Sequence, residues 1–510
     1  MRSHTPAAKL SSMPAGRETT LADRRTTHSV ISQKQLAILL SLLTIAGAWL
    51  RLSHLGSKSL WLDEGATVAL ARASWQHFWW VWWHGEANLQ TIYFLLMRGW
   101  IHLGDGEAWL RLPSALFGIA SIPAMYVVAR RLVSTGPALG AAALLAFSPA
   151  DVYYSQEARS YTLAILLVLL STYFFVRAVE QCQRRDWAWW MWISTLAFYT
   201  HDFAALVLIA QACSMLFKPE PQRWRPLLIR GTIILLLALP GLTYVLRASP
   251  ENLHFAWMPQ PSPREFLHLA AFYAGGGLKL AIASVLWIAG VIAIWYRGRS
   301  GEDANAFWHG TLVVLWAVLP AILLAIVSLR EPLFLQRYVI FSLPAWALLA
   351  AIGADLLRKW KVGLVLLILL CGTSIPAIVN AWSKPREDWR AACNVVLGHA
   401  SPGDAVVFFP FYSRIMLDYY QSRYPANVPP LHVFAPGYYA AGEGVQDLMR
   451  DLDTNPRQFR HVWVFVAGQN KSMRQFDGGA TLMDKLSYAF GTPVVHVGPD
   501  FEVAVLEYGK

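Results

Sequence analysis

Apolar segments of nearly bilayer-spanning length recur along most of this chain, between residues 36 and 382. Each approaches the roughly 20 residues that an α-helix needs to cross a membrane. Charged residues make up 15% of the sequence and hydrophobic residues 55%, whereas a soluble domain carries about 25% charged residues. The sequence therefore excludes an ordinary soluble enzyme, a disordered chain and a coiled coil, and it predicts a polytopic α-helical membrane protein.

Clusters of Arg and Lys set the expected orientation of these segments. They fall at every second boundary, for example at Arg130-Arg131 and Arg358-Lys359. Because cytoplasmic loops collect such residues, we expect about eleven spans, with the N-terminus inside and the C-terminus outside. The same rule accounts for the net charge of +11, so we expect no nucleic-acid partner. The spans are predicted near residues 36–52, 112–129, 136–154, 160–178, 187–200, 203–217, 228–246, 280–296, 307–328, 338–357 and 362–381.

Two polar stretches interrupt this pattern near the N-terminus. Residues 1–35 are rich in Ser, Thr and Arg, and we expect them to form a disordered cytoplasmic tail. The aromatic stretch from Trp75 to Leu103 is moderately apolar, but if it crossed the membrane every later basic cluster would face outward. We therefore predict a large first outer loop at about 54–110, whose juxtamembrane helices lie in the membrane interface.

The composition changes after residue 382, where polar residues replace the apolar runs. A helical pattern over 387–399 is followed by strand-like runs at 405–409, 461–466, 494–497 and 502–506. We interpret residues 383–510 as a soluble α/β domain outside the membrane. Cys393 is the only cysteine there, so no internal disulfide is expected, and no pair of cysteines has C-x-x-C spacing.

Ionisable and aromatic residues gather at the predicted outer ends of the spans. An ionisable group at a membrane boundary is costly to desolvate and usually has a function. One carboxylate could take a proton from an attacking hydroxyl, and cations could stabilise a leaving phosphate. The candidates are Asp63, Glu64, His84, Glu86, Glu157, Arg159, Tyr161, His201, Arg337 and Tyr338.

Each candidate also has a structural interpretation. Asp63 and Glu64 could form a solvated turn or a helix cap. Glu157 and Arg159 could form a structural ion pair at a helix start. His201 could be a packed interfacial residue. Arg337 and Tyr338 could help to set the membrane topology or belong to an interfacial aromatic belt.

Several motifs occur in a recognisable order. They are L-W-L-D-E at 60–64, W-L-R-L-P-S-A-L-F-G at 109–118, Y-Y-S-Q-E-A-R-S-Y at 153–161 and Q-R-Y at 336–338. Over about residues 36–382 this series resembles bacterial members of the dolichyl-phosphate-mannose protein mannosyltransferase superfamily. These are GT-C glycosyltransferases, which include the lipid A aminoarabinose transferases.

The resemblance implies a GT-C-like catalytic module in a bacterial inner membrane. It implies an inverting transfer from a polyprenyl-phosphate-linked sugar donor to an acceptor glycan, lipid or protein. Asp63 matches the family's base, with Glu64 adjacent, and Glu157 matches a residue that organises the acceptor or a metal. The chain departs from the family after residue 83, so we assign phosphate contact to Arg337 and His84. A divalent cation, Mg or Mn, could assist, although no ligand spacing requires one.

Other functions fit parts of the same pattern. A transporter or flippase for lipid-linked saccharides would place polar or broken-helix elements near the midplane, whereas the charges here lie at the outer ends. A scaffold of envelope assembly would use the C-terminal domain as a receptor surface. An oligosaccharide ligase would move a preassembled glycan on the same framework.

Overall fold

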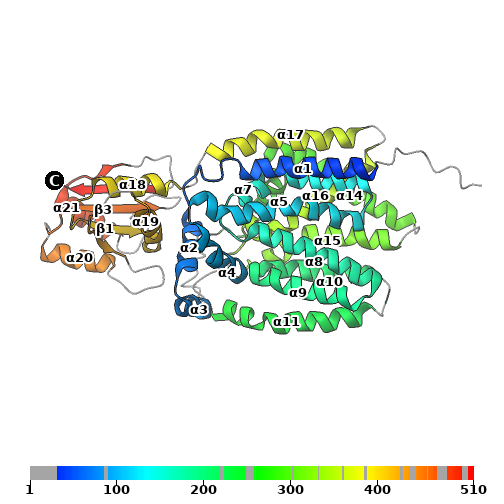
Figure 1. Cartoon of the computed structure of the whole chain (residues 1–510), viewed down its shortest axis with the longest axis horizontal. Coiled ribbons are helices and arrows are strands. Elements are labelled where there is room, and N and C mark those ends of the chain that lie inside the picture. Colours follow the sequence, from blue (N-terminus) through cyan, green and yellow to red (C-terminus); the bar gives the residue numbers. More distant parts are fainter. Residues whose placement is uncertain are drawn as a thin grey trace, which may run out of the picture.

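The computed structural model contains a bundle of long helices that adjoins a smaller region built around a β-sheet (Figure 1). It describes residues 32–84, 90–218, 220, 223–247, 258, 260–300, 304–330, 332–358, 361–383, 387–424, 429–435, 444–455, 458–467, 479–496 and 503–509. Most of the tail predicted at residues 1–35 therefore lies outside the described residues.

Eight helices among the described residues are long and apolar enough to cross a membrane. They coincide with eight of the predicted spans, which confirms a polytopic helical membrane protein. Large apolar side chains such as Leu42 on α1 and Ile368 on α17 are exposed, as expected for surfaces that face lipid. These spans are α1 (Gln33–Leu52), α5 (Glu107–Leu132), α8 (Tyr161–Gln181), α11 (Trp224–Arg247), α14 (Gly277–Ser300), α15 (Ala304–Val327), the 3₁₀ segment η7 (Gln336–Ser342) with α16 (Leu343–Leu356), and α17 (Val362–Ser383).

The other three predicted spans are helical but shorter. Residues 184–200 form α9 (Arg184–Thr200), and residues 202–217 form α10 (Ala205–Ser214) between two 3₁₀ turns. The segment 136–154 is two helices, α6 (Thr135–Ala146) and α7 (Pro149–Ser155), rather than one. Ser148 accounts for the break, because its side chain caps α7 and Pro149 occupies the first turn.

The first loop consists of short helices, as the sequence predicts. They are α2 (Leu62–Arg72), α3 (Trp75–His84) and α4 (Thr91–Trp100), followed by a 3₁₀ turn. A helix of about ten residues is only about 15 Å long, which is half of the hydrocarbon thickness of a bilayer. These helices therefore cannot cross it. A further short helix, α13 (Pro263–Ala274), was not predicted from the sequence.

The C-terminal region contains a five-stranded sheet in the order β2-β1-β3-β5-β4. Strand β1 pairs in parallel with β2 and β3, whereas β5 pairs antiparallel with β3 and β4. This confirms the α/β prediction, although the three-residue β2 was missed. The elements are β1 (Ala405–Phe409), β2 (His432–Phe434), β3 (His461–Ala467), β4 (Val494–Val495) and β5 (Val503–Gly509), with helices α18 (Trp389–His399), α19 (Arg414–Gln421), α20 (Val445–Thr454) and α21 (Gly479–Phe490).

One hydrophobic core joins the first loop to this sheet. Leu60 and Met97 from the loop pack in the same cluster as Trp389 and Phe465 from the C-terminal region. Helix α19 lies beside α2 (Figure 1). The approach is close enough that a Cβ atom at Gly65 would lie 2.3 Å from Met416 Sδ. Glycine at this position therefore permits the contact between α2 and α19.

Candidate functional site

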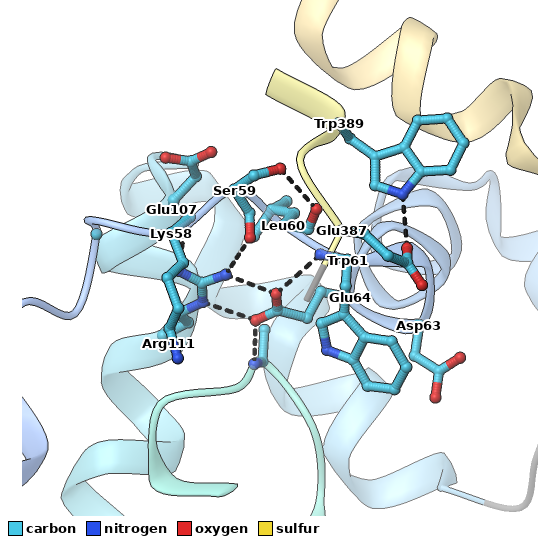
Figure 2. Close-up of polar contacts among 12 residues, drawn as sticks. Lys58, Ser59, Leu60, Trp61, Asp63, Glu64, Glu107, Arg111, Glu387 and Trp389 are labelled. Carbon is cyan, nitrogen blue, oxygen red and sulfur yellow. Dashed lines mark hydrogen bonds and ion pairs between the residues drawn. The ribbon is translucent and has the colours of Figure 1, made fainter. Parts of the chain in front are cut away.

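A buried ion pair between Glu64 and Arg111 lies at the end of the bundle next to the sheet (Figure 2). Arg111 Nε donates to Glu64 Oε1 at 2.8 Å, and Nη2 donates to Oε2 at 2.7 Å. The remaining guanidinium N–H groups donate to the carbonyls of Leu55, Lys58 and Ser59 at 2.9–3.0 Å. All five donors of this arginine are therefore used to fix the segment that leads into α2.

Glu64 also connects α2 to the loop between α7 and α8. Its Oε1 accepts the N–H of Ala158 at 2.7 Å, and its Oε2 accepts the N–H of Trp61 at 3.2 Å. The side chain is fully buried. Both carboxylate oxygens thus have two donors each, and the loop that contains Glu157 and Arg159 is held against α2.

Asp63 differs from its neighbour in exposure. Its side chain is 31% exposed, and its Oδ2 lies 3.8 Å from Arg159 Nη2 and 3.9 Å from Arg337 Nη2. It points away from Glu64 and Arg111 (Figure 2). Successive residues of a helix diverge by about 100°, so two adjacent carboxylates face different surroundings. Asp63 is accessible and lies between two guanidinium groups.

Both arginines near Asp63 are largely covered. Arg159 is 3% exposed and Arg337 is 12% exposed. Burial opposes the charge on Arg159, but Asp63 and Tyr161 outweigh that effect and raise the pKa of Arg159 above its ordinary value. Two largely covered positive charges therefore flank Asp63, and a charge that is shielded from water attracts an anion more strongly than an exposed one.

Aromatic side chains form one wall of this site. The rings of Tyr161 and Tyr338 lie 5.8 Å and 5.9 Å from the ring of His201. The guanidinium of Arg337 lies 5.6 Å from the centres of the Trp61 and Tyr338 rings. These cation–π contacts hold the guanidinium of Arg337 in place near Asp63.

Glu157 and Lys58 form a second pair of oppositely charged residues. Glu157 is almost completely buried and interacts electrostatically with Lys58. The Lys58 ammonium lies 5.2 Å from the centre of the Tyr153 ring. Burial and the nearby Arg111 lower the pKa of Lys58, while Glu157 partly restores it. The charged form of Lys58 is therefore less favoured than that of an exposed lysine.

A cavity of about 530 Å³ adjoins these residues. It opens between α7, α13, α17 and the start of η7. Tyr154 connects it to the site, since its ring lies 4.7 Å from that of Tyr161, and Gln336 precedes Arg337. Its wall is mostly apolar, and the polar side chains in it come from Tyr153, Tyr154, Gln156, His268 and Gln336.

The structure brings most of the predicted residues together. The carboxylate of Asp63 lies within ion-pair distance of both Arg159 and Arg337. The rings of Tyr161, His201 and Tyr338 lie next to one another in the same site. His84 instead lies exposed at the end of α3, with its Nδ1 2.8 Å from the Trp80 carbonyl. Glu86 lies outside the described residues. Among the described side chains no three His, Cys, Asp or Glu residues gather in a way that could hold a metal, so we derive no step through a cation.

Sequence reasoning assigned no role to Arg111 or Glu387. The other charged residues of α5 lie in its first and last turns, whereas Arg111 lies further inside the helix. A charge at that position is costly to desolvate, and this was a signal in the sequence that could have been used. Glu387 accepts the N–H of Leu62 at 2.9 Å across 325 residues of chain. Such long-range pairing leaves no local pattern in the sequence.

Residues 91–244 match the family model described as dolichyl-phosphate-mannose-protein mannosyltransferase. The structure resembles ArnT from Cupriavidus metallidurans bound to undecaprenyl phosphate, with 14% identity, a TM-score of 0.58 and coverage of 94% of this chain and 98% of that one. Apo ArnT gives a TM-score of 0.56 at 14% identity, with coverage of 93% and 98%.

The Archaeoglobus fulgidus oligosaccharyltransferase tethered to an acceptor peptide matches at 11% identity and a TM-score of 0.51, covering 94% of this chain and 74% of that one. No curated protein sequence matches the chain. At these identities the structural matches show the fold, which is that of ArnT. This fold and the match of residues 91–244 to the mannosyltransferase family model agree with the resemblance predicted from the sequence motifs.

Proposed function

We propose that this chain, which has the ArnT fold, is a membrane glycosyltransferase that moves a sugar from a polyprenyl-phosphate donor to a hydroxyl acceptor. The observation that carries the proposal is the placement of Asp63. Its accessible carboxylate lies between Arg159 and Arg337, and Gln336, which precedes Arg337, lines a large and mostly apolar cavity. A base, an anion site and space for a lipid tail are the three parts that such a reaction needs.

Arg337 and Arg159 are suited to bind the donor phosphate. Both are buried cations, and a guanidinium matches the geometry of phosphate oxygens. The prenyl tail would enter the cavity between α7, α13 and α17, whose lining is largely apolar. The ArnT structure with undecaprenyl phosphate supports this class of donor. His84 stays a predicted phosphate contact and Glu86 a predicted substrate contact, although His84 lies exposed beside Trp80 and Glu86 lies outside the described residues.

Asp63 would act as the general base. It takes the proton of the acceptor hydroxyl, whose oxygen then forms a bond to the anomeric carbon of the sugar. The bond from that carbon to the phosphate oxygen breaks on the opposite face, and its electron pair leaves with the polyprenyl phosphate. This single displacement inverts the anomeric configuration. Arg159 and Arg337 stabilise the charge that develops on the departing phosphate.

Glu64 is less suited to proton transfer than Asp63. Its oxygens already accept four hydrogen bonds, from Arg111, Ala158 and Trp61, and its side chain is fully buried. We assign it a positioning role, because it fixes both α2 and the loop that contains Arg159. Glu157, buried near Lys58, is placed to organise the acceptor. Tyr161, His201 and Tyr338 would form the wall against which the sugar packs.

The site residues gather at one end of the bundle, and by the positive-inside argument this is the outer face of the membrane. The acceptor there is a glycan, lipid or protein hydroxyl. A transporter would concentrate its polar groups near the midplane instead. No described feature favours transport or scaffolding over transfer.

The test is transfer of radiolabel from a panel of polyprenyl-phosphate sugars by purified protein in proteoliposomes, with membrane extract as the source of acceptors. Wild type should move label from at least one donor to an acceptor or to water. Asp63→Asn should lose this activity, whereas Asp355→Asn, at a carboxylate paired with Arg297 and Arg358 away from the site, should keep it. Movement of intact donor across the bilayer without cleavage would contradict the proposal and favour a flippase.

A further inference from the structure

The side chain of the residue before helix α2 makes no capping hydrogen bond, although Glu64 in the first turn accepts the N–H of that residue at 3.2 Å. That residue, Trp61, has no side-chain oxygen to accept the first N–H groups of the helix. The N–H groups of Glu64 and Gly65 are satisfied by the Trp61 carbonyl at 3.0 Å. The N–H of Leu62, the first helical residue, donates to Glu387 Oε2 at 2.9 Å. A carboxylate from another part of the chain therefore caps the helix that contains Asp63.

Glu387 is held in place by the C-terminal region. The same oxygen accepts the indole N–H of Trp389 at 2.6 Å. Trp389 is fully buried, and its ring lies 6.1 Å from that of Phe465 on β3. In Figure 2 Glu387 lies between Trp389, above it in the view, and Trp61 and Asp63, below it. The position of the capping carboxylate thus depends on the sheet.

A second set of contacts fixes the segment just before α2. Tyr420 on α19 accepts the N–H of Leu60 at 2.9 Å and donates to Glu107 Oε1 at 2.7 Å. Arg390 on α18 forms an ion pair with Glu107, and its backbone N–H donates to Ser59 Oγ at 3.1 Å. Residues 59, 60 and 62 are therefore each hydrogen-bonded to the C-terminal region.

We propose that Glu387 is a positioning residue for Asp63, and that the C-terminal sheet serves the reaction by fixing α2. The inference rests on the proposed function. A carboxylate at the first N–H of a helix forms a charge-assisted hydrogen bond and interacts favourably with the helix dipole. Without it the first turn of α2 frays, and Asp63 is the second residue of that turn. The oxygen of a base must lie within about 3 Å of the proton that it removes, so fraying lowers the rate.

The experiment compares Glu387→Ala and Glu387→Gln with Asp388→Ala. Asp388 is a matched control, because its side chain caps α18 by accepting the N–H of Ala391 at 3.1 Å and, among the described residues, forms no hydrogen bond or ion pair with α2. Glu387→Gln keeps one acceptor oxygen for Leu62. All variants retain the catalytic groups, so donor binding by Arg337 should be unaffected.

Hydrogen exchange reports on the cap without requiring activity. In Glu387→Ala, amides in a peptide that covers residues 61–66 should exchange about tenfold faster, as loss of a helix cap predicts. Asp388→Ala should accelerate exchange in α18 instead. Unchanged exchange at 61–66 in Glu387→Ala would overturn the inference, even if the chain proved not to transfer sugar.

Steady-state kinetics report on the function. Glu387→Ala should lower kcat by about tenfold while the KM for donor changes by less than about twofold, and Glu387→Gln should recover part of the loss. Equal effects of Glu387→Ala and Asp388→Ala on kcat would overturn the inference, because they would indicate general weakening of the C-terminal region. If wild type itself shows no transfer, the proposed function fails and the exchange result alone decides whether Glu387 caps α2.

Discussion

Removal of the Glu64 carboxylate should destabilise the protein far more than removal of an exposed charge. In Glu64→Ala, Arg111 would remain buried on α5 without a counter-charge. The N–H groups of Ala158 and Trp61 would also lose their acceptor. We expect the segment 55–64 and the loop 156–160 to separate, with loss of activity as a consequence.

The magnitude follows from the burial of the pair. Breaking a buried, hydrogen-bonded ion pair from one side costs about 3–5 kcal/mol, whereas replacing both partners with apolar residues can be nearly neutral. The double variant Glu64→Ala/Arg111→Met should therefore be less damaging than the sum of Glu64→Ala and Arg111→Met, by about 2 kcal/mol. Asp355→Ala is the control, since its partners Arg297 and Arg358 are substantially exposed and its loss should cost below about 1 kcal/mol.

The assay is unfolding by sodium dodecyl sulfate titration in mixed micelles, followed by circular dichroism. Wild type, both single variants, the double variant and Asp355→Ala are compared under identical conditions. If Glu64→Ala cost no more than Asp355→Ala, or if the effects of the single variants simply added, the reasoning about this buried pair would be refuted.

Three further predictions address other parts of the site. Arg337→Lys keeps the charge but loses the planar donor pair, so the KM for donor should rise about tenfold in steady-state kinetics; an unchanged KM would argue against phosphate binding at Arg337. Ala271 lines the cavity, so Ala271→Trp should fill it and should reduce transfer from long-chain donors more than from short-chain donors in competition assays. An equal reduction for both donors would argue against a prenyl tail in that cavity. Gly65→Ala should cost about 1–3 kcal/mol by overpacking against Met416, with Met416→Ala restoring stability, and a thermal melt that Gly65→Ala leaves unaltered would contradict the described contact of α2 with α19.

The membrane bundle could be predicted from sequence because hydropathy records each span locally. Residues 362–381, for example, are apolar throughout and form α17. The segment 136–154 misled the same reasoning, because its mean hydropathy conceals the Ser148-Pro149 break. Helix α13 escaped notice since it is short and half-polar. The strand β2 has only three residues, which is too few for an alternation pattern to be recognised.

The candidate site was only partly predictable. The sequence could indicate Asp63 and Glu64 as neighbours, but which of them is buried depends on where α2 begins, and that start is set by contacts from Arg111 and Glu387. The approach of Arg337 to Asp63 was expected from topology alone, because both lie at the same predicted face. His84 was assigned to phosphate because the chain departs from the family pattern in this loop. It lies exposed beside Trp80, and topology indicates only on which side of the membrane a loop residue lies.

The most direct measurement is single-turnover cleavage of the sugar–phosphate bond in a polyprenyl-phosphate donor that the wild type accepts, with wild type and Asp63→Asn compared at equal fractions of folded protein. The account predicts that Asp63→Asn binds the donor with similar affinity but cleaves it at least about a hundredfold more slowly, because general-base catalysis typically contributes 10²–10⁴-fold. Cleavage at the wild-type rate by Asp63→Asn would contradict the assignment of Asp63 as the base.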